Sequence, residues 1–306
     1  MAAEEDTRGT VAVVIHTVIL VHATIFSLTG NMFIIYALYR NRRLRTITNF
    51  YVVSLALADM MMAILSFPFQ ATASGLRKWF FGHHFCQLTG FVVQYWVQVS
   101  LSILTLASLN RYFCVVKPNK YSLLFTHRKT VTSLLGVWII LCIELLIFVF
   151  TAPIKFRWIP DSLYCRTTFD SESSERISFV FFACFSAVLM SVVVFCYYSI
   201  YRVVKQHNNV VVPSLQRANN HGRINAQDVK SSRAIFAAVL GFSIAWCPFI
   251  FMSMLEFGFQ VSIPSSAKSV YPLFSSLSAW INPVIYGIMN RAMRNEFQKI
   301  LFCRKD

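Results

Sequence analysis

Residues 47–70 read ITNFYVVSLALADMMMAILSFPFQ, and this stretch decides the class of fold. Its one charged side chain is Asp59, which stands among leucine, alanine and methionine residues. A predominantly apolar run of about 20 residues is long enough to cross a bilayer as a helix. The run lacks the alternation of apolar and polar residues that a membrane-spanning strand shows. We therefore expect residues 47–70 to form a membrane-spanning α-helix.

Six further apolar runs lie on either side of this stretch. They cover residues 11–39, 84–116, 128–151, 177–204, 232–257 and 267–289. An amphipathic stretch at 291–302 follows the last run and is typical of a helix that lies along a membrane surface. The sequence predicts an all-α protein, a seven-transmembrane helix bundle (11–289) between an amino-terminal segment (1–10) and a surface helix with a short tail (290–306).

Composition supports a membrane protein. Hydrophobic residues make up 56% of the chain and charged residues 13%, whereas a soluble domain carries about 25% charged residues. Of the 28 Lys and Arg residues, 20 fall on one side of the predicted spans, in the turn at 40–45, the segments 111–129 and 202–233, and the tail. The cationic side of a membrane protein faces the cytoplasm. We expect a multi-pass plasma-membrane protein with residues 1–10 outside and 290–306 inside, its net charge of +15 facing anionic lipid and cytosolic proteins rather than nucleic acid.

Two cysteines bear on this orientation. Cys86 opens the third span and Cys165 lies between the fourth and fifth, so both are expected outside, where an oxidising medium permits a disulfide. The alternative is two unpaired thiols. Cys303 follows the amphipathic stretch and is a candidate for palmitoylation, with a plain cytosolic thiol as the alternative.

Polar side chains inside the predicted spans are costly in lipid and therefore mark candidate functional sites. Asn31, Asp59, Ser100 and Asn282 lie in the first, second, third and seventh spans. If they converge, their oxygens suit a sodium ion at Asp59, Ser100 and Asn282. The alternative is a hydrogen-bonded cluster that joins the helices without an ion.

A second polar group joins the third and fourth spans. Gln94 and Gln98 share one helix face, and Glu144 lies deep in the fourth span. Either a ligand or a hydrogen bond between helices accounts for them.

In the sixth and seventh spans, Pro248 and Pro283 remove a helix hydrogen bond and so predict bends.

A series of short motifs runs through the seven predicted spans. In chain order they are Gly30-Asn31, Leu55-Ala56-Leu57-Ala58-Asp59, Trp79-Phe80-Phe81-Gly82, Cys86, Asn110-Arg111-Tyr112, Pro118, Trp138, Cys165, Tyr197, Phe242 with Ala245-Trp246-Cys247-Pro248, and Asn282-Pro283-Val284-Ile285-Tyr286. In this order and in these spans the motifs resemble those of the rhodopsin-like G-protein-coupled receptors, over residues 11–302. Asn110 and the Tyr286-Gly287…Asn290 run are similar to those of melatonin-type receptors, which typically carry alanine at the position of Pro283.

The resemblance implies a receptor, not an enzyme, whose inactive and active bundles are in equilibrium and respond to an outside ligand. It implies a heterotrimeric G protein, and arrestin, as cytoplasmic partners. Trp246 would sense the ligand, and Arg111 would pair at rest with Asp228. The residues of the implied switch are Asn110, Arg111, Tyr112, Tyr197, Asp228, Pro248, Asn282, Pro283 and Tyr286.

The sequence departs from the family in three places. Asn110 stands where an acid usually precedes the arginine, Leu189 where the fifth span usually has proline, and Ala245 where a cysteine usually precedes the tryptophan. The first departure removes one charge partner of Arg111, which could raise basal activity.

The resemblance also narrows the ligand. Val93 replaces the aspartate with which amine receptors pair an ammonium group, and Ser276 replaces the lysine with which opsins hold retinal. The aromatic side chains of the fifth and sixth spans favour an apolar or aromatic ligand. Glu256 and Lys268 either lie at the entrance to the ligand site or are solvated charges on its rim. The candidate ligand-binding residues are Gln94, Gln98, Glu144, Phe181, Phe185, Trp246, Phe249 and Ser276. Two other functions compete with this one: a transporter or channel, and a light receptor. The sequence shows neither the repeated halves nor the paired broken helices that are typical of a transporter.

Overall fold

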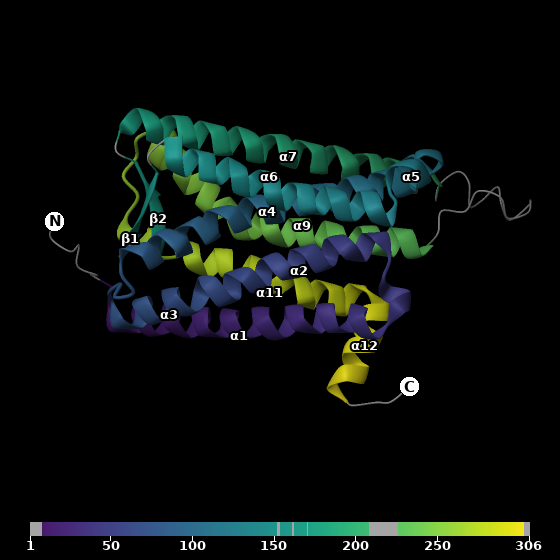
Figure 1. Cartoon of the computed structure of the whole chain (residues 1–306), viewed down its shortest axis with the longest axis horizontal. Helices are drawn as coiled ribbons and strands as arrows, with labels where there is room; N and C mark the ends of the chain where they lie inside the picture. The colour runs from purple at the N-terminus through teal and green to yellow at the C-terminus, as the bar shows by residue number, and fades with distance from the viewer. Residues whose placement is uncertain (1–7, 152–153, 161, 170, 208–225, 303–306) are drawn as a thin grey trace, which may run out of the picture.

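A computed structural model describes the chain except for residues 1–7, 152–153, 161, 170, 208–225 and 303–306. The long helices of the described part run side by side in a single bundle (Figure 1). A two-stranded hairpin lies across one end of the bundle, and the last helix turns away from the other end. We call these the hairpin end and the α12 end.

Each predicted span falls on a helix, which confirms the predicted class of fold. The helices of the bundle are α1 (Thr10–Arg40), α2 (Ile47–Leu65) with its continuation α3 (Phe67–Leu76), α4 (His83–Val116), α6 (His127–Thr151), α7 (Glu172–Gln206), α9 (Ala226–Ser253) and α11 (Tyr271–Met289). The shorter elements are η1 (Arg42–Leu44), α5 (Pro118–Leu124), the π-helical turn η3 (Met254–Gly258), α10 (Ser265–Lys268) and α12 (Arg291–Leu301).

Six of the described helical stretches are long and apolar enough to cross a membrane by length and composition. Helix α11 is the shorter, more polar seventh helix, and it packs against both α1 and α9. Its buried residues include Ser276, Ser278 and Asn282. Ser276 and Ser278 donate hydrogen bonds to carbonyls of their own helix, whereas Asn282 donates to Asp59 of α2.

Prolines set the shape of two helices. Helix α2 ends at Leu65 and α3 begins at Phe67, with Pro68 in the first turn of α3, a position where the missing N–H is not needed. Pro283 lies inside α11 and leaves the carbonyl of Ala279 without its helical donor. That carbonyl instead accepts hydrogen bonds from Asn31 Nδ2 at 3.0 Å and Ser27 Oγ at 3.2 Å. The proline thus creates the acceptor that fastens α11 to α1.

The hairpin was not predicted from the sequence. Strands β1 (Lys155–Ile159) and β2 (Tyr164–Thr168) pair antiparallel, with Trp158 opposite Cys165. At the other end, Asn290 caps α12 by accepting hydrogen bonds from the N–H groups of Ala292 and Met293. Met293 is fully buried against the bundle, which places the amphipathic helix where the sequence predicts it.

Candidate functional site

The hairpin is fixed to the top of α4. A disulfide joins Cys86 to Cys165, as predicted. One residue further along α4, Gln87 Nε2 donates to the carbonyl oxygen of Phe156 at 2.6 Å, while Gln87 Oε1 accepts from the N–H of Phe156 at 3.1 Å. The Phe156 ring packs directly over Gly90. One covalent bond and two hydrogen bonds therefore hold the strands at a defined position.

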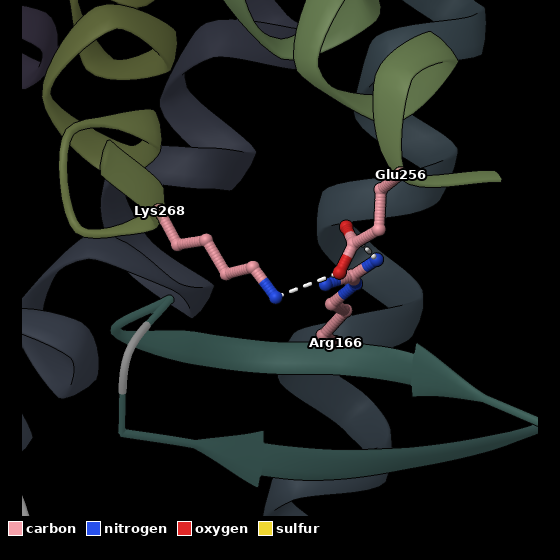
Figure 2. Close-up of polar contacts among 3 residues, drawn as sticks. All are labelled: Arg166, Glu256 and Lys268. Carbon is pink, nitrogen blue, oxygen red and sulfur yellow. Dashed lines mark hydrogen bonds and ion pairs between the residues drawn. The ribbon is translucent and has the colours of Figure 1, made fainter. Parts of the chain in front are cut away.

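This position brings three charged side chains together at the hairpin end (Figure 2). Glu256 Oε2 accepts from Arg166 Nη2 at 3.1 Å, and Glu256 Oε1 accepts from Lys268 Nζ at 2.7 Å. Arg166 follows the disulfide on β2, Glu256 lies in the turn η3 that continues α9, and Lys268 ends α10 before α11. Each side chain is about one fifth exposed or less. We call this group the charged triad; it joins the hairpin to the ends of α9 and α11.

Arg166 remains cationic in this setting. Burial lowers the pKa of Arg166, but its interactions with Tyr164, Glu256 and Tyr271, including the hydrogen bond to Glu256, outweigh burial and raise the pKa above its ordinary value. Burial also raises the pKa of the Tyr164 phenol, which therefore stays neutral at physiological pH. The triad thus holds two cations and one anion. The sequence left Glu256 and Lys268 open as entrance residues or solvated rim charges. The structure pairs them with each other and with Arg166, which no spacing along the chain could connect to them.

A column of aromatic rings descends from the triad into the bundle. The ring of Tyr271 meets Phe249 at 5.3 Å between centroids, Phe249 meets Trp246 at 5.7 Å, and Trp246 meets Trp96 at 5.8 Å. Tyr271 and Trp246 are buried, yet the Tyr271 hydroxyl and the Trp246 Nε1 have no hydrogen-bond partner in the part of the chain that the structure describes. An unpaired buried polar group costs about 1–3 kcal/mol. The column therefore offers two unsatisfied polar atoms that a ligand could satisfy.

The column ends on the buried carboxylate of Asp59. Trp96 Nε1 donates to Asp59 Oδ1 at 3.2 Å, and Asn282 Nδ2 donates to Asp59 Oδ2 at 2.9 Å. Trp96 is completely buried, and Ser100 Oγ is buried without a hydrogen-bond partner among the described residues. Asn31 donates its amide N–H groups to Ser27 and Ala279 instead. Of the polar residues predicted to converge, Asn282 therefore binds the Asp59 carboxylate, and it does so through a nitrogen donor.

These contacts do not fit a sodium ion. A hard cation needs several oxygen ligands, whereas both Asp59 oxygens face N–H groups, which repel a cation. The Trp96 indole occupies the space beside Oδ1. The sodium site at Asp59, Ser100 and Asn282 stays a prediction, and the arrangement favours the hydrogen-bonded alternative.

We expect sodium to stabilise the protein only after Trp96 is made small. In Trp96→Asn, sodium chloride should raise the apparent melting temperature by a few degrees over choline chloride at equal ionic strength, because an ion that binds only the folded state stabilises it. The native protein should melt at the same temperature in both salts. Adding Asp59→Asn should abolish the response. A sodium-dependent shift in the native protein would show that the indole does not exclude the ion.

The remaining candidate ligand residues separate into two groups. Gln98 Nε2 donates to Glu144 Oε2 at 3.1 Å. Among the described residues, Gln98 Oε1 and Glu144 Oε1 are buried without a hydrogen-bond partner, and Gln94 makes no hydrogen bond. Phe185 packs against the main core, and Ser276 Oγ is buried and donates to the Leu273 carbonyl. Phe181 is 40% exposed on the bundle surface. Phe249, Trp246, Gln98 and Glu144 thus face the interior, whereas Phe181 is a weaker candidate.

At the α12 end, Arg111 is buried in a small polar network. Its Nε and Nη2 donate to Asn110 Oδ1 at 3.1 and 2.6 Å, and Nη2 also donates to Thr48 Oγ1 of α2. Asn110 Nδ2 reaches Tyr121 of α5 at 3.4 Å. The amide oxygen of Asn110 thus accepts hydrogen bonds from two nitrogens of the guanidinium. Thr48 lies in a motif-free part of α2 and was not predicted.

The other predicted switch residues lie on the helices around Arg111. Tyr197 is partly buried beside Phe236 of α9, and Tyr286 is buried with Met293 and Ala234. Tyr112 faces away, toward the ring of Phe195 on α7. The side chain of Asp228 and residue Cys303 lie outside the described part of the chain, so the resting pair and the palmitoylation stay predictions.

Comparison with known proteins identifies the family. Residues 30–286 match the family described as 7 transmembrane receptor (rhodopsin family). The chain belongs to the rhodopsin family of seven-transmembrane receptors. It is 26% identical to melatonin receptor type 1A of Phodopus sungorus over 291 residues, which is 92% of this chain and 79% of that protein. It is 28% identical to G-protein coupled receptor 54 of Oreochromis niloticus over 292 residues, which is 89% of this chain and 74% of that protein.

The receptor is also similar in fold to squid rhodopsin. The crystal structure of squid rhodopsin superposes with a TM-score of 0.82 at 20% identity, covering 98% of this chain and 90% of that one. Membership of the family makes the chain a multi-pass membrane receptor that signals as G-protein-coupled receptors do, and not an enzyme. The identity of its ligand and of its G protein is a separate question.

Proposed function

We propose that this receptor binds a small extracellular ligand beneath the hairpin and, in response, activates a heterotrimeric G protein at its α12 end, where arrestin is a further partner. The orientation rests on two independent features. The segments that the sequence assigns to the cytoplasmic side, which include the described α12 end, contain 20 of the 28 Lys and Arg residues. The hairpin end carries the disulfide, which forms in an oxidising compartment.

The observation that carries this proposal is the unbroken path from one end of the bundle toward the other. Arg166 and Glu256 of the charged triad interact electrostatically with Tyr271, whose ring begins the column that ends on Trp96 and Asp59. Asn282, which binds Asp59, precedes Pro283 in α11, and Tyr286 of the same helix packs beside α12 and α9. A ligand that moves the column therefore acts on the helices that surround Arg111.

The ligand that suits this path is aromatic or apolar with a few polar atoms. Its body would contact Trp246 and Phe249, and its polar atoms would meet the Tyr271 hydroxyl or the Glu144 carboxylate. Val93 offers no carboxylate to an ammonium group on that side of α4. Several relatives are named melatonin receptors, so melatonin and related aromatic amides are suitable first compounds. Retinal is not proposed because Ser276 cannot form a Schiff base.

A screen of small aromatic compounds tests the proposal. A compound that binds should raise the apparent melting temperature of the purified receptor and change nucleotide exchange on added G protein. Trp246→Ala should weaken both responses to the same compound. Epitope tags at the two chain ends should be reached on opposite faces of the plasma membrane. Tags on the same face would refute the seven-span orientation.

We expect Glu256→Gln to destabilise the receptor by about 1–2 kcal/mol, because Arg166 and Lys268 lose the anion between them. The apparent melting temperature should fall by a few degrees. Glu175→Gln, which removes the same charge from α7 at the same end, is the matched control and should have little effect. Adding Lys268→Gln to Glu256→Gln should recover part of the loss. Equal melting of the Glu256 and Glu175 variants would mean that the triad does not hold the hairpin.

A further inference from the structure

A carboxyl group and an amide group meet inside the bundle, between α4 and α6. Gln98 Nε2 donates to Glu144 Oε2 at 3.1 Å. The second oxygen of each side chain, Gln98 Oε1 and Glu144 Oε1, is buried and has no hydrogen-bond partner among the described residues. Gln98 is only 3% exposed, so its amide is shielded from bulk water. We call these two side chains the acid–amide pair; it has two buried acceptor oxygens that lack a donor.

Glu144 lies on the side of α6 that faces the bundle. Leu141 and Leu145 share this side with it, and both are buried in the main core. Ile143 and Ile147, on the other side of α6, are 52% and 54% exposed. The carboxyl group is therefore directed toward α4 and not toward the lipid.

No cationic side chain balances this carboxyl group. Within the described part of the chain, no Lys or Arg forms an ion pair with Glu144. Beyond Lys129, Glu144 is the only charged residue of α6. Arg111 is the one Lys or Arg of α4, and it lies toward the α12 end, in contact with Asn110 and Thr48. A buried charge is costly unless it is paired, so the acid–amide pair lacks a positive charge as well as donors.

Aromatic rings lie beside the acid–amide pair. Tyr95, one turn before the amide in α4, donates through its hydroxyl to the Trp138 carbonyl oxygen of α6 at 2.6 Å. One turn beyond Glu144, toward the hairpin end, Phe148 meets the ring of Phe181 of α7 at 4.9 Å between centroids. Aromatic faces attract cations and also pack against aromatic ligands. These surroundings suit a ligand that joins a positive charge to a ring.

We propose that the acid–amide pair binds the protonated primary amine of an aromatic ligand. This inference rests on the proposed function, because the amine belongs to the ligand that the receptor binds beneath the hairpin. A primary ammonium group has three N–H donors, so it can donate to both unpaired oxygens and also supply the missing charge. A neutral amide supplies one N–H donor and no charge. The counter-ion that Val93 cannot provide on α4 is thus provided by Glu144 on α6.

The test compares tryptamine with N-acetyltryptamine, which has the same ring but a neutral amide. Their affinities for the purified full-length receptor, without G protein, follow from the rise in melting temperature with concentration. Tryptamine should bind at least about tenfold more tightly than N-acetyltryptamine, because a charge-assisted hydrogen bond is worth about that factor or more. Glu144→Gln keeps an acceptor oxygen for Gln98 but removes the charge. It should weaken tryptamine binding about tenfold or more and change N-acetyltryptamine binding less than about twofold.

Two further variants separate the effect of the charge from an effect on folding. Glu144→Asp retains a carboxylate and should keep the preference for tryptamine. Glu175→Gln removes the same charge from α7 at the hairpin end, and it should bind both compounds as the native receptor does. Without a compound, Glu144→Gln should melt no lower than the native receptor, because it removes a buried charge and keeps the hydrogen bond from Gln98.

Three outcomes would overturn the proposal. Equal tryptamine affinity in the native receptor and Glu144→Gln would mean that the pair closes on itself, with a protonated Glu144 donating to Gln98 Oε1. Tighter binding of N-acetyltryptamine than of tryptamine would exclude an ammonium site while leaving the proposed function intact. No response to either compound up to about 1 mM would exclude it as well. Nucleotide exchange is not part of this readout, so a failure of G-protein activation would not alter the result.

Discussion

Arg111→Ala is expected to lower nucleotide exchange on G protein by at least about tenfold, both with and without ligand. Arg111 is 3% exposed and lies on α4 at the end where the G protein is proposed to bind. It is held by Asn110 and Thr48 through hydrogen bonds to neutral oxygens. Neutral acceptors hold a cation less strongly than a carboxylate does. These two sets of hydrogen bonds therefore break at a low free-energy cost when the helices rearrange, and alanine has no guanidinium for the G protein to contact.

The matching measurement compares purified variants with the same G protein. Arg128→Ala removes an exposed arginine from the same end of the bundle and should exchange normally. Asn110→Asp places a carboxylate beside Arg111 and should lower ligand-independent exchange several-fold, because a charge-assisted contact stabilises the resting network more. Equal exchange in the native receptor and Arg111→Ala would count heavily against G-protein activation at this end.

The sequence predicted the spans well because span length is imposed by the bilayer rather than by neighbouring residues. It was less accurate at a helix boundary that depends on local packing. The second span was predicted to run to residue 70, but α2 ends at Leu65 and α3 resumes at Phe67 around Pro68. A membrane span is predicted from hydropathy, and the hydropathy of the sequence does not change between the end of α2 and the start of α3.

The chemistry of the candidate site was predicted only in part. The motifs placed Asp59 and Asn282 in spans that meet, and the two side chains do form a hydrogen bond. No motif indicated Trp96, because a tryptophan in an apolar span looks like ordinary packing. Its role depends on the one carboxylate that faces it from α2. The charged triad could likewise not be predicted from the sequence. Arg166 is 90 residues from Glu256, and the two side chains are in contact because of where the hairpin lies.

The hairpin also gives the second large effect, which we expect at Gly90. A Cβ added there would lie 2.4 Å from the Phe156 ring and 2.7 Å from the carbonyl oxygen of Cys165. The ring could turn, but the carbonyl belongs to a backbone that the disulfide fixes to Cys86 on the same helix. Gly90→Ala should therefore destabilise the receptor by about 2–4 kcal/mol. Gly136→Ala in α6, where nothing lies within 4 Å, is the matched control and should be neutral or slightly stabilising.

The cost of Gly90→Ala should also depend on the charged triad. To make room for the new methyl group, β2 must move away from α4, and Arg166 directly follows Cys165 on that strand. The movement draws Arg166 from Glu256, so a receptor that carries Gly90→Ala has already lost part of that ion pair. Glu256→Gln should then lower the melting temperature less in the Gly90→Ala background than in the native one. Strictly additive losses would show that the hairpin and the triad are independent, and the path from the ligand to α9 would have to begin below Glu256.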